Sequence, residues 1–272
     1  MDFLASLLIY GLVFFWGAAI GSFLSVVIHR VPAEQSIWLP PSHCPQCGHR
    51  LKPWENLPIA GWLSLKGRCS HCKTPIPVRY PLLEVVCGIV FLLVFIAFGV
   101  TWQTLGYWLF FSWLLALALI DIDTMTLPNP LTQSGLIAGL SFRAVVGFSS
   151  GTFAGAAQAL MEGVVGAVLG LWLLDLIAIA GSYALGQTAM GSGDSKLAAL
   201  MGAWLGWQNL LLGGFLACLL GAIAGGAGMA LGLLNRRQPF PFGPFLALGG
   251  FIAAIWGNAV VSLYLQLFLP TP

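Results

Sequence analysis

The chain has 272 residues, of which 58% are hydrophobic and only 7% are charged. Soluble domains carry about 25% charged residues, so this composition excludes a soluble fold and predicts an all-α polytopic membrane protein in a lipid bilayer. The formal net charge is only +2, which excludes a nucleic-acid-binding protein.

The first 28 residues are apolar and begin without the basic segment of a signal peptide. A run of this length spans a bilayer, so we expect a retained first transmembrane helix over 1–28. Gly17 and Gly21 have the spacing that lets a second helix approach closely. In a chain with 34 glycines the same spacing also arises by chance, and both interpretations stand.

Seven further apolar stretches follow, separated by Gly, Pro, Asn and Asp residues that favour turns. Together with the first stretch they predict about eight transmembrane helices. The stretch at 196–206 is too short to cross without its flanks and could instead be re-entrant. The expected stretches are 82–99, 104–120, 131–148, 158–182, 196–206, 208–234 and 244–267.

Basic residues indicate the topology, because they collect in cytoplasmic loops. Seven of the eleven Lys and Arg residues and all four His lie between His29 and Arg79. We therefore expect the N-terminus outside and the 29–81 segment in the cytoplasm. Alternation of the helices then places further segments inside: 121–130, 191–196 and, if 196–206 crosses, Arg236 with Arg237.

Three domains are expected from this layout: the first transmembrane helix at 1–28, a cytoplasmic four-cysteine domain at 29–81, and a membrane-embedded domain at 82–272. Arg143 and Asp175 stand within apolar stretches, where ionisable groups are expensive. An ion pair, a water-lined cavity or a functional role would each explain them.

Four cysteines of the cytoplasmic segment form two Cys-x-x-Cys pairs separated by 21 residues: Cys44, Cys47, Cys69 and Cys72. Two such pairs can direct four thiolates at one zinc ion, although the gap slightly exceeds the usual spacing of about 15–20 residues. A reducing cytoplasm disfavours disulfides. Four thiolates leave no open coordination position, so the zinc would be structural; redox-active or free thiols are the alternative.

Two acidic segments are expected at the same membrane edge. Asp121 and Asp123 end the 104–120 stretch, and Asp194 begins the 196–206 stretch. Two carboxyl groups held close together share a proton, so one activates a water molecule while the other polarises a carbonyl. The alternative is that these carboxylates only cap helix ends.

The residues around Asp194 read Gly191-Ser192-Gly193-Asp194-Ser195-Lys196. Gly191 and Gly193 present no side chain, so the backbone of a substrate could lie against this segment. Lys196 would balance negative charge or meet lipid headgroups. We count these three residues as accessory site residues, together with Asp123.

The chain resembles the bacterial type IV prepilin leader peptidases, which also N-methylate their product. The Gly-x-Gly-Asp signature at 191–194 is present in full, and Ser25 and Asn129 depart from the family's usual Asn and Asp. The blocks that carry the resemblance are 21–32, the four-cysteine loop closing on 79–84, 121–132, 191–207 and 242–247.

The resemblance implies that Asp121 and Asp194 are the catalytic pair. Asp121 is chosen over Asp123 because the family's first catalytic aspartate precedes the Leu-Pro proline by seven positions, as Asp121 precedes Pro128. The implied substrates are prepilins and type II secretion pseudopilin precursors, cleaved at the cytoplasmic edge of the bacterial inner membrane.

The resemblance also implies methyl transfer from S-adenosylmethionine to the new N-terminal amine. The sequence has no dinucleotide-type glycine motif to mark a site for that cofactor. We expect the site near Glu84 and the 29–81 loop.

Two other classes of protein remain as alternatives. A transporter or channel would also carry intramembrane acids, but it would typically show an internal repeat of broken helices, and none is apparent. A non-catalytic assembly scaffold would use the zinc loop for docking. A dead homologue would be expected to lose one aspartate, and both are present.

Overall fold

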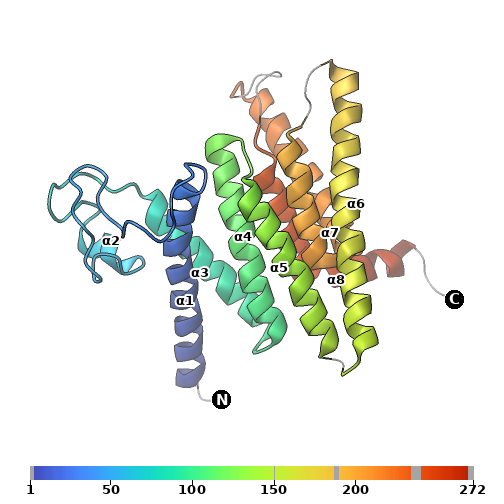
Figure 1. Cartoon of the computed structure of the whole chain (residues 1–272), viewed down its shortest axis with the longest axis horizontal. Helices are drawn as coiled ribbons and strands as arrows, with labels where there is room; N and C mark the ends of the chain where they lie inside the picture. Colours follow the sequence, from blue (N-terminus) through green and yellow to red (C-terminus); the bar gives the residue numbers. More distant parts are fainter. Residues whose placement is uncertain (1–2, 150, 187–189, 234–239, 269–272) are drawn as a thin grey trace. The chain divides into compact units, whose positions relative to one another are not determined.

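The computed structural model describes residues 3–149, 151–186, 190–233 and 240–268, and within them the chain is helical without a β-strand (Figure 1). The predicted all-α fold is confirmed. The helices are α1 (Phe3–Arg30), α2 (Ala60–Ser64), α3 (Arg79–Phe98), α4 (Trp102–Thr124), α5 (Asn129–Phe148), α6 (Phe153–Leu185), α7 (Ser192–Ala230) and α8 (Gly243–Phe268).

Seven of these helices, all except α2, are long and apolar enough to cross a membrane. Every predicted apolar stretch falls on one of them, and the count is seven because the stretches at 196–206 and 208–234 both fall on α7. Gly206 inside α7 has non-helical backbone angles, with φ 76° and ψ 173°. The helix therefore consists of two segments joined at Gly206.

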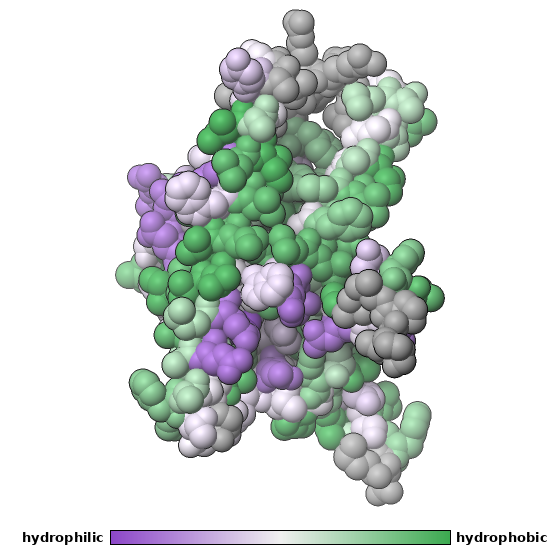
Figure 2. Space-filling model, turned by 90° about the vertical axis from the view of Figure 1, so that its right-hand side faces the viewer, coloured by the Kyte–Doolittle hydropathy of each residue, from purple (hydrophilic) through white to green (hydrophobic). Residues whose placement is uncertain are grey.

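Hydrophobic side chains predominate on the face of the molecule shown in Figure 2, and hydrophilic side chains form smaller clusters on it. Large apolar residues such as Trp172, Phe215 and Leu263 are exposed. Such a surface suits contact with lipid, because an aqueous surface rarely carries so many large apolar groups. The seven spans make the chain a multi-pass membrane protein. Arg236 and Arg237, used above for the topology, lie outside the described residues.

The chain divides into two compact units, residues 1–112 and 113–272, and the boundary falls within α4. In the first unit α1 packs against α3. A Cβ atom on Gly17 would lie 2.7 Å from the Phe91 side chain, and one on Gly21 would lie 2.9 Å from the Glu84 Cα atom. The glycine pair therefore does form a close helix contact.

In the second unit α7 packs against α5, α6 and α8, and α5, α6 and α7 lie side by side (Figure 1). Small residues bring α6 and α7 together. A Cβ atom on Gly170 would lie 2.5 Å from the carbonyl oxygen of Ala198. Fully buried side chains of Leu197, Leu200 and Met201 fill the interior beside the start of α7.

Arg143 on α5 lies beside the break in α7. Its guanidinium pairs with Glu162 of α6 at 2.6 Å and donates hydrogen bonds to the carbonyl oxygens of Ala159 and Trp204, at 2.9 and 3.3 Å. The break at Gly206 frees carbonyl groups from the helix ladder, and Arg143 supplies a donor there. Of the explanations open for Arg143, the ion pair is the observed one.

Asp175 is the other charged residue within a predicted apolar stretch. It lies half-buried on α6, and the described residues offer it no ion pair or hydrogen-bond partner for its side chain. Nothing in the structure explains it.

Candidate active site and metal centre

Asp121 lies in the last turn of α4, with only 6% of its surface exposed. The helix ends three residues later, where Thr124 bonds back to the Ile120 carbonyl and Met125 adopts a positive φ of 53°. Asp123 lies in the same turn but is exposed. At the end of α4, Asp121 is therefore buried and Asp123 is exposed.

Asp194 lies in the first turn of α7 and is 7% exposed. Gly191 precedes the helix as its N-cap, and the backbone N–H of Asp194 bonds to the Gly191 carbonyl at 3.2 Å. A Cβ atom on Gly193 would lie 3.0 Å from the Leu127 side chain. The absence of a side chain at Gly193 therefore lets the loop after α4 pack against the start of α7.

The fold brings Asp121 and Asp194 together, close enough for their carboxyl groups to interact electrostatically. A third segment joins them, because the backbone N–H of Gly243, the first residue of α8, donates a 2.9 Å hydrogen bond to Oδ2 of Asp121. Lys196 points elsewhere, since its Nζ donates to Oδ1 of Asn129 on α5 at 2.8 Å. Two buried carboxyl groups this close to each other can share one proton.

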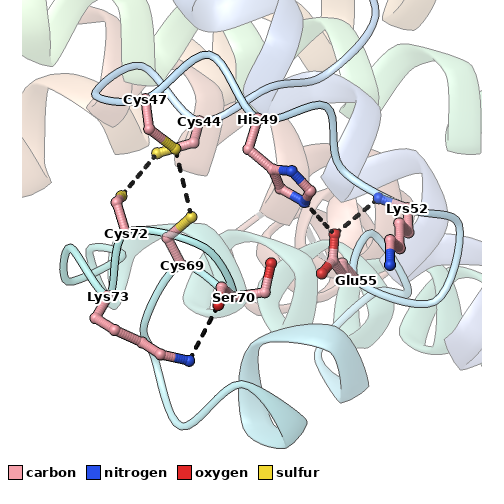
Figure 3. A network of polar contacts seen from close by, with 9 residues as sticks. All are labelled: Cys44, Cys47, His49, Lys52, Glu55, Cys69, Ser70, Cys72 and Lys73. Atoms are coloured by element: carbon pink, nitrogen blue, oxygen red, sulfur yellow. Dashed lines mark hydrogen bonds and ion pairs between the residues drawn. The ribbon is translucent and has the colours of Figure 1, made fainter.

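The four cysteines of the 29–81 segment form one cluster, with their sulfur atoms within 4.8 Å of one another. Cys44 and Cys72 are 3.7 Å apart and Cys47 and Cys69 are 4.0 Å apart, as Figure 3 shows. Four sulfurs at tetrahedral zinc, each about 2.3 Å from the metal, lie about 3.8 Å apart. The cluster can therefore hold one metal ion of this kind.

The two Cys-x-x-Cys turns are built alike, at an offset of 25 residues along the chain. The Cys44 N–H bonds to the carbonyl of His49, and the Cys69 N–H bonds to that of Thr74, both at 2.9 Å. Gly48 and Lys73 follow the second cysteine of each turn and share a positive φ, 69° and 61°. The repeated Cys-x-x-Cys spacing was the signal for this likeness in the sequence.

The thiols differ in how readily they ionise. Hydrogen bonds from the side chain and then the backbone of Thr74 lower the pKa of Cys72 to about 6. A hydrogen bond with the backbone of His49 lowers the pKa of Cys47, but burial and the neighbouring thiols outweigh it and raise this pKa to about 11. A divalent cation between the sulfurs would favour the thiolate form of all four.

Glu55 was not recognised as a site residue from the sequence. It lies next to the cysteine cluster and accepts a 2.8 Å bond from the Lys52 N–H and a 3.3 Å contact from His49 (Figure 3). The Lys52 N–H, followed by the hydroxyl of Ser70, holds the pKa of Glu55 below its usual range. Its carboxylate ties the segment between the two turns to the first turn.

Glu84 on α3 is 8% exposed, and its Oε2 accepts a 2.6 Å bond from the Ile59 N–H at the start of α2. It also lines an open cavity of about 1270 Å³ in the first unit. The wall includes a second carboxylate, Glu55, and the aromatic rings of Trp62 and Tyr80. Glu84 thus joins the loop to the membrane helix at the edge of a large cavity.

Comparison with known proteins covers most of the chain. Residues 15–98 match the model of the bacterial peptidase A24 N-terminal domain, and residues 108–226 match that of the type IV leader peptidase family. The prepilin leader peptidase/N-methyltransferase of Pseudomonas aeruginosa is 39% identical to the chain, over 92% of the chain and 91% of that protein. The proteins of the same name from Stutzerimonas stutzeri and Aeromonas hydrophila are each 38% identical; the aligned regions cover 92% and 96% of the chain, and 91% and 96% of those relatives. No solved structure matches the chain.

Proposed function

Because the chain belongs to the type IV leader peptidase family, we propose that it removes the leader from prepilins and pseudopilin precursors with Asp121 and Asp194 as its catalytic pair. It is a membrane protease with a second, methyltransferase activity. The observation that carries the choice of residues is the meeting of two buried carboxyl groups from the end of α4 and the start of α7.

The two carboxyl groups share one proton in the resting enzyme, because two adjacent negative charges in a poorly solvated place are costly. The ionised member takes a proton from a water molecule, whose oxygen attacks the scissile carbonyl carbon. The protonated member donates a hydrogen bond to the carbonyl oxygen. A proton then passes to the leaving amine as the peptide bond breaks, which frees the new N-terminus.

The burial of Asp121 and the exposure of Asp123 support the assignment of Asp121. Gly191 and Gly193 serve as accessory residues, because neither presents a side chain that would keep the backbone of a substrate away from this segment. Lys196 is a positioning residue, since its bond to Asn129 ties the start of α7 to the start of α5. Asp123 is an accessory neighbour on the exposed side of the same turn.

Zinc is the metal that suits the cysteine cluster, because four thiolates at tetrahedral spacing are its usual structural ligand set. Bound by Cys44, Cys47, Cys69 and Cys72, it would hold the two turns of the loop together. All four positions belong to cysteines, so the metal has no open position for substrate, and its role is to fold the 29–81 domain.

S-adenosylmethionine is the methyl donor, and the cavity beside Glu84 fits it. Its positive sulfonium and amino groups suit the carboxylates of Glu55 and Glu84, and its adenine suits the rings of Trp62 and Tyr80. The cavity exceeds the usual size of a small-molecule site, about 300–1000 Å³, so it has room for a peptide N-terminus as well.

The seven spans lie in the bacterial inner membrane, with the N-terminus outside and the aspartates facing the cytoplasm. The concentration of basic residues in the 29–81 domain supports this orientation. The 1–28 helix anchors that domain, and the 82–272 domain carries the protease. Precursors with a basic leader and an apolar helix then meet the aspartates at the membrane edge.

The test is cleavage of a purified prepilin in proteoliposomes by the wild type and by Asp121→Asn, Asp194→Asn and Asp123→Asn. Loss of at least about a thousandfold in the first two, with near-normal cutting by Asp123→Asn, is expected because each member of the pair is essential. Normal cleavage by both variants would mean that the carboxylates only cap helices, and a transporter or scaffold would become the better interpretation.

A separate test addresses methylation. Glu84→Gln keeps an oxygen that can accept the Ile59 N–H but removes the charge. We expect S-adenosylmethionine binding by calorimetry to weaken more than tenfold while cleavage continues. Unchanged binding by Glu84→Gln would place the cofactor elsewhere.

A further inference from the structure

Gly243 begins α8 in contact with Asp121. The Phe242 carbonyl accepts the first bonds of the helix, from the N–H groups of Phe245 and Leu246. The N–H of Gly243 has no partner within its own helix, as is general for the first residues of a helix. It is instead directed at Oδ2 of Asp121, 2.9 Å away, in a buried hydrogen bond.

We infer that the backbone N–H of Gly243 positions Asp121 as the ionised member of the pair, which takes the proton from water, while Asp194 carries the shared proton. This inference rests on the proposed aspartyl mechanism and adds an assignment of roles to it. Gly243 is a positioning residue, because it acts on substrate only through Asp121.

The surroundings of the two carboxyl groups are unequal. A hydrogen bond donated to a carboxylate favours its charged form, and the start of α8 adds the positive end of a helix dipole. Asp194 also lies in the first turn of a helix, α7, but no described residue donates a hydrogen bond to its side chain. The negatively charged form is therefore stabilised more at Asp121 than at Asp194.

The other charged groups of this region do not reverse that order. Lys196 of α7 directs its ammonium group at Asn129, and Asp123 lies on the exposed side of α4. Helix α8 contains no Asp, Glu, Lys, Arg or His, and the one charged residue of α5, Arg143, pairs with Glu162. The Gly243 hydrogen bond is thus the contact that distinguishes the two carboxyl groups.

The hydrogen bond to Asp121 also depends on the absence of a side chain at position 243. A Cβ atom on Gly243 would lie 2.8 Å from Oδ2 and 3.2 Å from Cγ of Asp121. Even a methyl group would push the carboxylate away from the N–H. The close approach requires glycine here, and an alanine separates the two groups without removing the donor.

The first experiment uses the unaltered protein. The sequence contains two Phe-Gly pairs, Phe98-Gly99 and Phe242-Gly243, so ¹³C-carbonyl Phe with ¹⁵N-Gly labelling selects two amide signals in an NMR spectrum. The Gly99 N–H bonds to the Phe95 carbonyl at 2.8 Å and serves as the reference. We expect the Gly243 signal to titrate with pH and to shift in Asp121→Asn, while the Gly99 signal stays constant.

A Gly243 amide signal that stays unchanged both across the pH range and in Asp121→Asn would overturn the inference, whatever the result for Gly243→Ala.

The second experiment is Gly243→Ala, with Gly214→Ala and Gly225→Ala as controls, since an added Cβ at either control position meets nothing within 4 Å. Gly243→Ala is expected to lower kcat for cleavage at least tenfold, and the controls to leave it unchanged.

The pH profile separates this role from a general loss of fold. Without the hydrogen bond from the N–H of residue 243, the ionised form of Asp121 is less favoured, so the acid limb of the kcat/KM profile is expected to move to higher pH in Gly243→Ala. Misfolding alone would lower activity equally at every pH. Normal cleavage and an unchanged limb in Gly243→Ala would refute this inference, whereas active Asp121→Asn and Asp194→Asn variants would refute the aspartyl mechanism itself.

Discussion

The aspartate site and the four-cysteine loop hold their functional groups by different means. The aspartates lie on helix ends whose neighbours, such as Leu197 and Met201, are fully buried. Between the end of α1 and the start of α3 the only regular element is the five-residue α2, and the buried apolar residues there are two cysteines, Cys44 and Cys69. Packing therefore maintains the aspartate site, whereas the cysteine loop has, in place of an apolar core, four sulfur atoms that could hold a metal ion.

Removal of the proposed metal should affect the cysteine loop far more than the aspartate site. Structural zinc contributes about 10 kcal/mol or more to the folding of zinc-finger peptides, and this loop has little apolar core to replace it. After treatment with a chelator, or in a Cys44→Ser, Cys69→Ser double variant, we expect proteolysis within 29–81 to accelerate more than a hundredfold. Cleavage sites and rates can be followed by mass spectrometry.

The aspartate site should respond little to the same treatment. The thermal unfolding of the membrane helices is expected to shift by no more than a few degrees, because α5 to α8 pack without the loop. The matched control is Cys218→Ser on the exposed side of α7. Unchanged protease resistance and zinc content in the double variant would contradict a structural zinc site.

A change in helix packing should destabilise the membrane helices and leave the cysteine loop unaffected. Gly170→Ala places a methyl group 2.5 Å from the Ala198 carbonyl oxygen, and such overpacking costs about 2 kcal/mol. We expect a lower midpoint of thermal unfolding in detergent with unchanged zinc content. Gly225→Ala, where the added atom meets nothing within 4 Å, should not lower the midpoint. Equal effects at the two positions would show that α6 and α7 are not in tight contact.

The smallest expected effect concerns the likeness of the two cysteine turns. Gly48→Ala forces a side chain into a positive-φ position, which costs about 1 kcal/mol, so zinc affinity should fall about fivefold. Lys73→Gly relieves the equivalent position and should not weaken zinc binding. Gly151→Ala places the same strain in the second unit and serves as the control. Competition with a chromophoric chelator measures the zinc affinity of all three variants. Weaker zinc binding by Lys73→Gly would mean that the two turns are not equivalent.

The sequence was most informative where a local pattern carries the information. Apolar stretches of sufficient length located the seven membrane helices found among the described residues, and the two Cys-x-x-Cys pairs predicted the cluster of four sulfurs. Both follow from spacing along a short segment. The assignment of the catalytic roles to Asp121 and Asp194 stays a prediction, although the fold brings the two residues together.

Contacts between distant segments could not be read in this way. The hydrogen bond between Gly243 and Asp121 joins residues 122 positions apart, and the sequence of neither segment indicates that it contacts the other. The apolar pattern divided 196–206 from 208–234, but it did not show that the two stretches form one helix, α7, with a break at Gly206. Such features depend on how the helices pack.

The pairing of Arg143 with Glu162 has a consequence for how the protein is made. An arginine on a lone helix is costly to insert into a bilayer. The helices that carry the two residues, α5 and α6, are joined by the short connection between Phe148 and Phe153, so the arginine can enter the membrane already paired with Glu162. Helix α7 is synthesised later, and the guanidinium already in place then donates a hydrogen bond to the Trp204 carbonyl oxygen.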